Sequence, residues 1–453
     1  MKTLARILFP MMLLATESIL ASDNITALRD YIKATYGEEL MISDAQVSQL
    51  SWVMDNPHAT PEMDHHKLAG MHKEVPRALS RIYNLQRLRS GTPQDYEQFI
   101  APQKKEMVTP LSPDSFRQLS DAIRSMDEYH YEVLAAAAII SSVTLSPEAI
   151  KRARLVPDLK LPTDSVQFLA VTAPEASKIY PLAQLLSKRF KTGNHLFEIA
   201  FMPNSHLRHM MYNEGSLTMY EHIERGLSNG SVSRNDLTFW YYHWVINIAG
   251  FRGQIAPKGS LYLTQNTYNA MSAVKAVLDK LGKDKGNKSF NPMRAYLGKR
   301  ADWLKLDHYT HNTDEQIALA SIAASLRLFS PDQGKQLYQA FHKLSSKDQK
   351  RWLDYSHYQL SNTTTPAPTY APALFANAVV EAGLADTIIS VLPLFLDVID
   401  KEQQMRKNGQ LNPEVPVSFR LLSQHQQVHR LLHQLHRGLV IIDPVTGVAS
   451  ITK

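Results

Sequence analysis

TDEQIALASIAASLRLFSP, residues 313–331, is the stretch that decides the fold class of this chain. Thr313 and Gln316 resemble a capping box, in which the third side chain reaches back to the first. Ser330-Pro331 then places an N-cap hydroxyl before a proline at the first position of a further helix. Between these signals, apolar residues recur at spacings of three and four: Ile317, Leu319, Ala320, Ala323, Ala324 and Leu326. That face is too broad for an exposed helix, so the stretch predicts a buried helix followed closely by a second one.

The same start signal recurs along the chain. A hydroxyl residue precedes proline at four further places: Thr60-Pro61, Thr92-Pro93, Ser112-Pro113 and Ser146-Pro147. Two more capping boxes are predicted at Thr92/Asp95 and Ser233/Asp236. Downstream of Ser112 the apolar residues again follow helical spacing: Phe116, Leu119, Ile123 and Met126. We therefore expect many helices, each with its own N-cap.

Strand patterning, by contrast, is nearly absent. Val166 to Val171 predicts one short strand, and Leu439 to Thr452 predicts a terminal β-hairpin that turns near Pro444 to Gly447. The fold class predicted from the sequence is therefore all-α: a large multi-helix body, a smaller C-terminal helical part and a terminal hairpin.

The domain division rests on composition. SNTTTPAPTYAP, residues 361–372, carries Thr, Pro and Ala but no charge, which is typical of a linker. We therefore expect a helical body at residues 23–360 and a C-terminal helical region at residues 373–453. A second stretch, Lys280 to Pro292, is rich in Lys, Gly and Asn and should form an exposed loop.

Charge and cysteine content exclude several classes of protein. The 49 Lys and Arg residues oppose 43 Asp and Glu residues, and the surplus of +6 is dispersed over 453 residues. Without a dense basic stripe, nothing favours nucleic acid as a partner. The absence of Cys excludes a disulfide scaffold, a thiolate zinc site and a Cys nucleophile. Catalysis would have to use His, carboxylates, hydroxyls or Lys.

The N-terminal residues resemble a secretion signal. Lys2 and Arg6 form a basic start, Ile7 to Ala15 form an apolar run, and Ala21 or Ser22 offers a small residue for cleavage. We expect residues 1–22 to be a signal peptide and the protein to be exported, to a periplasm or beyond; the alternative is a buried N-terminal helix.

No transmembrane segment is expected after the signal. The richest apolar stretch, Ile388 to Ile399, contains Pro393 and Asp397 and is shorter than the 18 or so residues that a spanning helix needs. We interpret it as a core helix.

Eighteen histidines make His the most promising catalytic type, and they fall into three clusters. The first comprises His58, His65, His66 and His72 beside Asp64, and the third comprises His425, His429, His433 and His436. In the first cluster, a spacing of seven residues separates His65 from His72 by about 10 Å on a helix, too far for one metal ion unless the chain bends; the alternative is that these are solvated helix histidines. The third forms a stripe at the border of an apolar helix face. Such a stripe could bind a metal through pairs four residues apart, or loosen the helix when protonated; ordinary boundary histidines are the simplest interpretation.

The second cluster, residues 195–227, holds the densest set of polar candidates. Two pairs have a spacing of three residues: His195 with Glu198, and His206 with His209. This spacing suits either metal ligation or an acid–base pair. Glu214 follows the second pair in the sequence. His243 and Asn247 lie farther along, four residues apart in an aromatic run that predicts a buried helix. A buried His needs partners, because an unpaired one costs about 1–3 kcal/mol.

A phosphate site is expected directly after that helix. Gly250 and Gly253 flank Arg252, and Lys258 follows in PKGS. Glycines let a backbone approach an anion, and the two cations could bind a phosphate. The alternative is a C-cap glycine with a surface Arg.

These segments resemble the helical phosphodiesterase domain of the SidE-type effectors of Legionella. The resemblance rests on NIAGFRGQIAPKGSLYLTQNT (247–267), the preceding Glu214-Gly215 and the following FNPMRAYLGKRADWL (290–304). Upstream, MHKEVPRALSRIYNL (71–85) and YEVLAAAAIISSV (131–143) occupy places that HD-like folds give to catalytic helices. The resemblance implies an all-helical, HD-like fold that cleaves a phosphodiester in a modified protein with His and Glu. An HD dipeptide is absent near Ile139 to Ser142.

Two functions follow. The first is a phosphodiesterase-like hydrolase of a phosphodiester or nucleotide-type substrate, with His206, His209, Glu214 and His243 as catalytic candidates and Arg252 and Lys258 binding the phosphate. Its partner would be a phosphate-bearing ligand or a modified protein. The second is an exported non-catalytic helical relative that binds a protein or ligand partner, which the missing HD dipeptide favours. The sequence leaves any metal or cofactor open.

Overall fold

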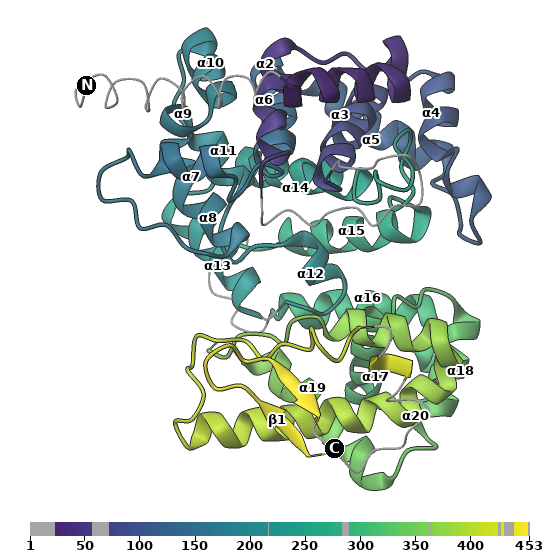
Figure 1. The fold of residues 1–453 in the computed structure, drawn as a ribbon. Coiled ribbons are helices and arrows are strands. Elements are labelled where there is room, and N and C mark those ends of the chain that lie inside the picture. The colour runs from purple at the N-terminus through teal and green to yellow at the C-terminus, as the bar shows by residue number, and fades with distance from the viewer. Residues whose placement is uncertain are drawn as a thin grey trace. The chain divides into compact units, whose positions relative to one another are not determined.

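The computed structural model describes residues 23–56, 72–215, 217–282, 290–362, 364–424, 427–429 and 439–451. These residues are mostly helical, and their sheet is a two-stranded antiparallel hairpin near the C-terminus. The chain divides into two compact units: unit 1 (Met1–Pro203 and Ser233–Tyr268) and unit 2 (Asn204–Val232 and Asn269–Lys453). Figure 1 shows each unit as a cluster of helices. The predicted all-helical character is confirmed.

In unit 1, helix α3 forms the centre, and α4, α5, α6 and α14 pack around it (Figure 1). The helices of unit 1 are residues 23–36, α2 (Asp44–Leu50), α3 (Glu74–Ser90), α4 (Pro93–Ile100), α5 (Pro113–Ser125), α6 (Glu128–Ile140), α7 (Pro147–Ala153), α8 (Ser165–Thr172), α9 (Ala176–Ile179), α10 (Pro181–Phe190), α11 (His195–Ala200) and α14 (Arg234–Ala249). Short 3-10 turns are η1 (Gly37–Glu39), η2 (Ser51–Val53), η3 (Gln103–Lys105) and η4 (Ala173–Glu175). The buried Arg81 of α3 donates to Ala138 O and to the hydroxyls of Ser141 and Ser142, so its charge lies at the carboxyl end of α6.

In unit 2, α17 forms the centre and is buried from Ile317 to Leu326, as the sequence of residues 313–331 predicts. Helices α16, α19 and α20 pack against it. The elements of unit 2 are α12 (Leu207–Met211), α13 (Leu217–Asn229), the greater part of α15 (Gln265–Leu278), α16 (Pro292–Leu304), η5 (Leu306–His308), α17 (Thr313–Leu326), α18 (Pro331–Phe341), α19 (Ser346–Ser361), α20 (Ala371–Lys407), β1 (Val440–Ile442) and β2 (Ala449–Ile451). The indole N–H of Trp352 donates to Ala318 O at 2.8 Å, which ties α19 to this core.

Most of the predicted helix starts are confirmed. The side chains of five caps accept the backbone N–H three residues later: Thr92, Ser112, Ser146, Ser233 and Ser330. Both predicted boxes, Thr92/Asp95 and Ser233/Asp236, are present, whereas Thr60-Pro61 lies outside the described residues. The prediction at Thr313 is wrong. Asn312 caps α17, because its side-chain oxygen already accepts from the N–H groups of Asp314 and Glu315.

One predicted strand is also wrong. Residues 166–171 belong to α8, which Asp164 caps by accepting from the N–H groups of Val166 and Gln167. A short apolar run does not by itself distinguish a strand from a helix, and the cap decides between them here. The predicted hairpin is confirmed, since β1 pairs with β2 in the register Val440 to Ile451 and turns through Asp443 to Gly447.

The predicted linker, residues 361–372, lies wholly within unit 2. It joins α19 to α20, and Thr369 exchanges backbone hydrogen bonds with Val417 and Phe419. Asn362 closes a turn by accepting from the N–H groups of Thr364 and Thr365. The predicted loop at 280–292 falls largely outside the described residues.

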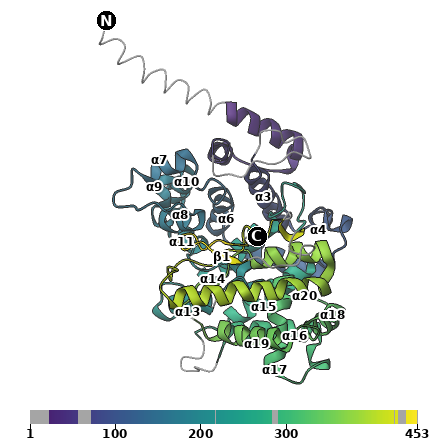
Figure 2. The ribbon, with the colours of Figure 1, turned by 60° about the horizontal axis from the view of Figure 1, so that its bottom comes forward.

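Helix α20 is longer than the apolar stretch that the sequence indicates. It spans Ala371–Lys407 and is interrupted at Gly383, whose φ of 79° and ψ of 173° are not helical. Figure 2 shows its length within unit 2. By length and composition, α20 is the described helix that could cross a membrane, and 44% of its most apolar window is buried inside the structure. Ile388 to Ile399 form part of it, with most of their apolar side chains in the core.

Candidate functional site

His206, His209 and Glu214 come together in unit 2 around the short helix α12. His206 is the N-cap residue of α12 and His209 follows one turn later, so their rings stack with centroids 4.0 Å apart and planes 6° apart. The chain then turns through Asn213, whose φ is 56°. This turn brings Glu214 Oε2 to 3.7 Å from His209 Nε2. The structure thus assembles three of the four predicted catalytic residues.

The protonation of this cluster follows from its surroundings. Burial lowers the pKa of His209 below its usual value; the Glu214 carboxylate opposes the shift and Arg208 adds to it. The side chain of His209 is nevertheless 27% exposed and that of Glu214 is 14% exposed. His209 is therefore a neutral imidazole at pH 7 that solvent can still reach, beside a carboxylate that stabilises its protonated form.

Glu214 is held by a second contact. Its Oε1 accepts the backbone N–H of Tyr370 at 2.9 Å, while its Oε2 faces His209. Tyr370 is the N-cap residue of α20, so the carboxylate lies at the positive end of that helix. One oxygen thus fixes the side chain and leaves the other to the imidazole.

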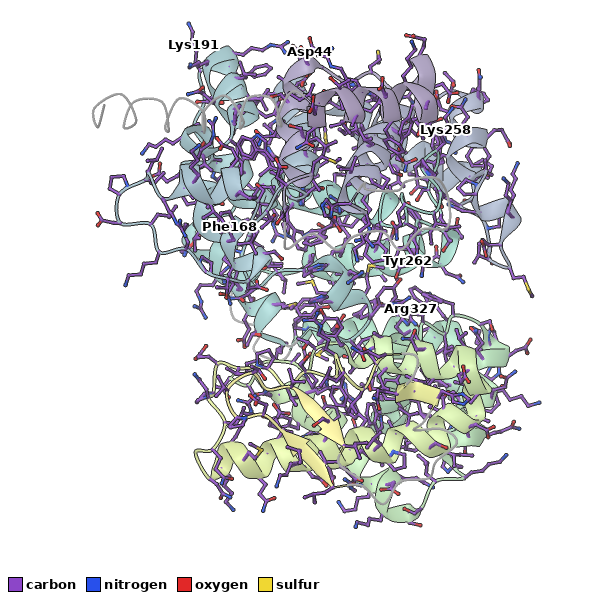
Figure 3. The ribbon with its side chains drawn as sticks, in the orientation of Figure 1. Asp44, Phe168, Lys191, Lys258, Tyr262 and Arg327 are labelled. Carbon is purple, nitrogen blue, oxygen red and sulfur yellow. The ribbon has the colours of Figure 1, made fainter. Side chains whose placement is uncertain are left out.

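The neighbouring residues hold α12 in place. The hydroxyl of Tyr296, which lies on α16 and is fully buried, donates to Met211 O at 2.6 Å. Arg327 lies over the ring of Tyr212, with its guanidinium carbon 4.8 Å from the ring centre. Figure 3 labels Arg327 in unit 2. These contacts anchor the carboxyl end of α12. The turn to Glu214 begins directly after Tyr212, the C-cap residue of α12.

His243, the fourth predicted catalytic residue, lies in unit 1 and is buried on α14. Asn247 Nδ2 donates to its Nε2 at 3.0 Å, so the predicted His–Asn pair is present. The rings of Phe201 and Trp244 pack edge-on against the imidazole. Burial lowers the pKa of His243 to about 3, and the nearby Arg81 charge adds to this effect. His243 is thus neutral at physiological pH and only 4% exposed, which suits a core residue better than a proton carrier.

The glycines around Arg252 have a packing role. A Cβ atom at Gly250 would lie 2.7 Å from Arg81 N, and one at Gly253 would lie 2.6 Å from Pro76 O. Both glycines therefore let the end of α14 approach the backbone of α3 closely. On this side of the loop, α3 fills the space in which the sequence leads us to expect an anion. Arg252 itself is exposed.

Lys258, the other predicted phosphate ligand, forms an ion pair. Its Nζ lies 2.7 Å from Glu39 Oε1, and this contact, with that of Tyr83, lowers the pKa of Glu39. The hydroxyl of Tyr83 donates to the other carboxylate oxygen of Glu39 at 3.0 Å. Figure 3 labels Lys258 in unit 1. Lys258 thus joins the loop after α14 to η1 and α3.

The remaining histidines are distributed over both units. His195 pairs with Asp236 at 3.0 Å rather than with the predicted Glu198. Asp236, the partner of Ser233 in the capping box of α14, reaches His195 from a neighbouring helix. His429 pairs with Glu381 at 2.6 Å. Seven of the predicted cluster residues lie outside the described residues: His58, Asp64, His65, His66, His425, His433 and His436.

Two histidine–carboxylate pairs were missed by sequence reasoning. His130 lies 2.8 Å from Asp127, and their spacing of three residues is a signal that the sequence contains. His342, at the end of α18, lies 2.9 Å from Glu315 on α17. No local pattern links residues on two different helices, so only the packing of α17 against α18 brings this pair together.

Within the ranges that the structure describes, no group of three or more His, Asp or Glu side chains is arranged to hold a metal ion. Comparison with protein-family models, curated proteins and solved structures finds no match to this chain.

Proposed function

We propose that this chain is a phosphodiesterase-like hydrolase and that His209 and Glu214 of unit 2 form its acid–base centre. The observation that supports this proposal is the imidazole of His209, which is kept neutral by burial, is open to solvent and lies beside a carboxylate. A general base works best when its pKa lies near the working pH, because it is then largely unprotonated and still basic enough to accept a proton.

In this proposal, His209 takes a proton from water as that water attacks the phosphorus atom. Glu214, 3.7 Å away, stabilises the imidazolium that forms. The alcohol leaves as the phosphorus–oxygen bond breaks, and the imidazolium of His209 returns its proton to the leaving oxygen. His206 stacks at 4.0 Å, where two protonated rings would repel each other. The stack therefore disfavours simultaneous protonation and keeps one ring available as a base.

Arg252 and Lys258 of unit 1 remain proposed phosphate ligands. Arg252 is the stronger candidate, because it is exposed while Lys258 is paired with Glu39. The proposal also includes export through residues 1–22. It further includes a distant relationship to the SidE-type phosphodiesterases, which have an HD-like fold.

Hydrolysis of bis(4-nitrophenyl) phosphate by the full chain tests this proposal. Replacing His209 or Glu214 by Gln should lower kcat by about a hundredfold or more, as is usual when a general acid–base group is lost. His222→Gln is the matched control, since His222 lies on the neighbouring α13 and also has a pKa lowered by burial. Turnover that survives His209→Gln, or that falls equally with His222→Gln, would contradict the assignment.

A role for Arg252 is tested separately. Arg252→Lys should weaken binding of a phosphate-bearing ligand such as a nucleoside monophosphate about tenfold, because Lys cannot make the bidentate contact. The melting temperature should change little, since Arg252 is exposed. Unchanged affinity, or a drop of several degrees in melting temperature, would reject Arg252 as a phosphate ligand.

The distribution of the candidates favours a second function: a non-catalytic helical protein that binds a partner. His243 is buried in unit 1, while Glu214 accepts a hydrogen bond from the start of α20. The burial of His243 and the hydrogen bond to Glu214 each have a structural role that requires no substrate. Under this alternative, the full chain gives no turnover above buffer, and Glu214→Gln lowers the melting temperature without changing any rate.

A further inference from the structure

Unit 1 contains a groove that takes no part in the proposed hydrolysis. It has a volume of about 590 Å³ and lies between the start of α2 and helices α3, α6 and α10. Its walls are mainly apolar: Met41, Ile82, Ala135, Leu182, Leu185 and Leu186. Met41 is 72% exposed and Leu185 is 51% exposed, so two large apolar side chains at the groove are in contact with water. This volume falls in the range of small-molecule sites.

Most polar side chains that line the groove are engaged elsewhere. Ser43 and Gln46 form the capping box of α2. Gln86 both donates to and accepts from the backbone of Met41. Arg189 forms an ion pair with Glu128, which neutralises its charge. These side chains stabilise the walls of the groove and leave few donors or acceptors for a ligand.

Glu132 and the hydroxyl of Tyr131 differ from the others. Among the described residues, the Glu132 carboxylate has no ion-pair or hydrogen-bond partner, although the residue is only partly exposed. The Tyr131 hydroxyl likewise has no hydrogen-bond partner within the described part of the chain. Arg89 covers the face of the Tyr131 ring, with its guanidinium carbon 4.9 Å from the centre, and donates to three carbonyls at the end of α5. The groove therefore combines an apolar body with one unneutralised carboxylate.

We infer that this groove binds a small apolar molecule that carries a protonated amine. The apolar part would replace water along Leu182, Leu185 and Leu186, and the ammonium group would donate to Glu132. Complementary charge specifies the cation, because a carboxylate in an apolar groove is stabilised by a donor that bears the opposite charge. Burial, with the charge of Glu132, raises the pKa of Tyr131 to about 12, so its hydroxyl stays protonated and can orient the ligand.

Calorimetric titration of the full chain with three ten-carbon probes tests this inference. Decylamine should bind about tenfold more tightly than decanol, and decanoate should bind most weakly, in line with one charge-assisted hydrogen bond. Glu132→Gln should reduce the affinity for decylamine to that for decanol and leave decanol unaffected. Its melting temperature should match that of the parent chain, because Glu132 forms no contact that folding requires.

Two further variants complete the test. Leu185→Ser should weaken all three probes about tenfold, since it removes apolar contact from an exposed wall. Glu106→Gln is the charge control: Glu106 is an exposed carboxylate of unit 1 that does not line the groove, and its loss should change nothing. Equal affinity for the three probes, an equal effect of Glu106→Gln, or no effect of Leu185→Ser would overturn the inference. Phosphodiester hydrolysis is not the readout, so failure here leaves the proposed function untouched.

Discussion

Replacing His243 by Gln should change how the stability of this chain depends on pH. In the folded chain the pKa of His243 is lowered to about 3, whereas an exposed imidazole has a pKa of about 6.5. Above pH 6.5 the side chain is neutral in both states. Below it, the unfolded chain binds a proton that the folded chain rejects until about pH 3. The free energy of unfolding therefore falls as the pH falls through this window.

The magnitude follows from the same two values. Each unit of pKa shift corresponds to about 1.4 kcal/mol, so the loss from His243 alone is about 2 kcal/mol between pH 7 and pH 5. Gln does not titrate, and its amide can keep a hydrogen bond to Asn247. His243→Gln should be less stable than the parent chain at pH 7, by about 1–2 kcal/mol for imperfect packing. Because only the parent loses the His243 contribution, this difference should disappear or reverse near pH 5.

Urea unfolding at pH 7, 6 and 5 gives the required free energies. Trp240 and Trp244 lie on α14 with His243, so tryptophan fluorescence follows the region in question. His311→Gln is the control, because it replaces an exposed histidine of unit 2. The reasoning is refuted if the parent and His243→Gln lose stability in parallel between pH 7 and pH 5.

Three further outcomes follow from the packing and the N-terminus. Gly253→Ala should destabilise the chain by about 2 kcal/mol, because its Cβ would meet the backbone of α3. Gly298 has open space on a helix, so Gly298→Ala should stabilise the chain by about 0.5–1 kcal/mol. Similar melting temperatures for the two variants would contradict this. Arg300 is fully buried and donates to Ala323 O and Leu328 O at the end of α17. Arg300→Met should lower the free energy of unfolding in urea by about 1–3 kcal/mol, since it leaves Leu328 O unpaired; a smaller loss would refute that role. Mass spectrometry of exported protein should find a mature chain that begins near Ser22 or Asp23, and an intact Met1 would exclude the signal peptide.

The candidate site was only partly predictable. The spacing of His206 and His209 indicates that their side chains share one face of a helix, and the structure stacks them. Glu214 lies beyond the end of α12, so its approach to His209 depends on the left-handed turn at Asn213 and on the N–H of Tyr370. No sequence pattern indicates a contact with a residue on α20.

The residues around Arg252 show a different limit. Two glycines beside an Arg suggest an open backbone, and in sequence this pattern is the same whether an anion or a helix occupies the space. The structure places α3 there, against Gly250 and Gly253. It also pairs Lys258 with Glu39, a residue 219 positions earlier in the sequence.

The sequence by itself determined the helical class, the positions of most helix starts and the terminal hairpin. Caps and apolar spacing act between residues three or four positions apart, so the local sequence contains the whole interaction. Only the tertiary structure decided that His243 is buried and neutral, that residues 361–372 lie within unit 2, and that an unpaired Glu132 lies in an apolar groove. Burial and charge pairing depend on which distant segments come together, because a side chain loses water only when another part of the chain covers it.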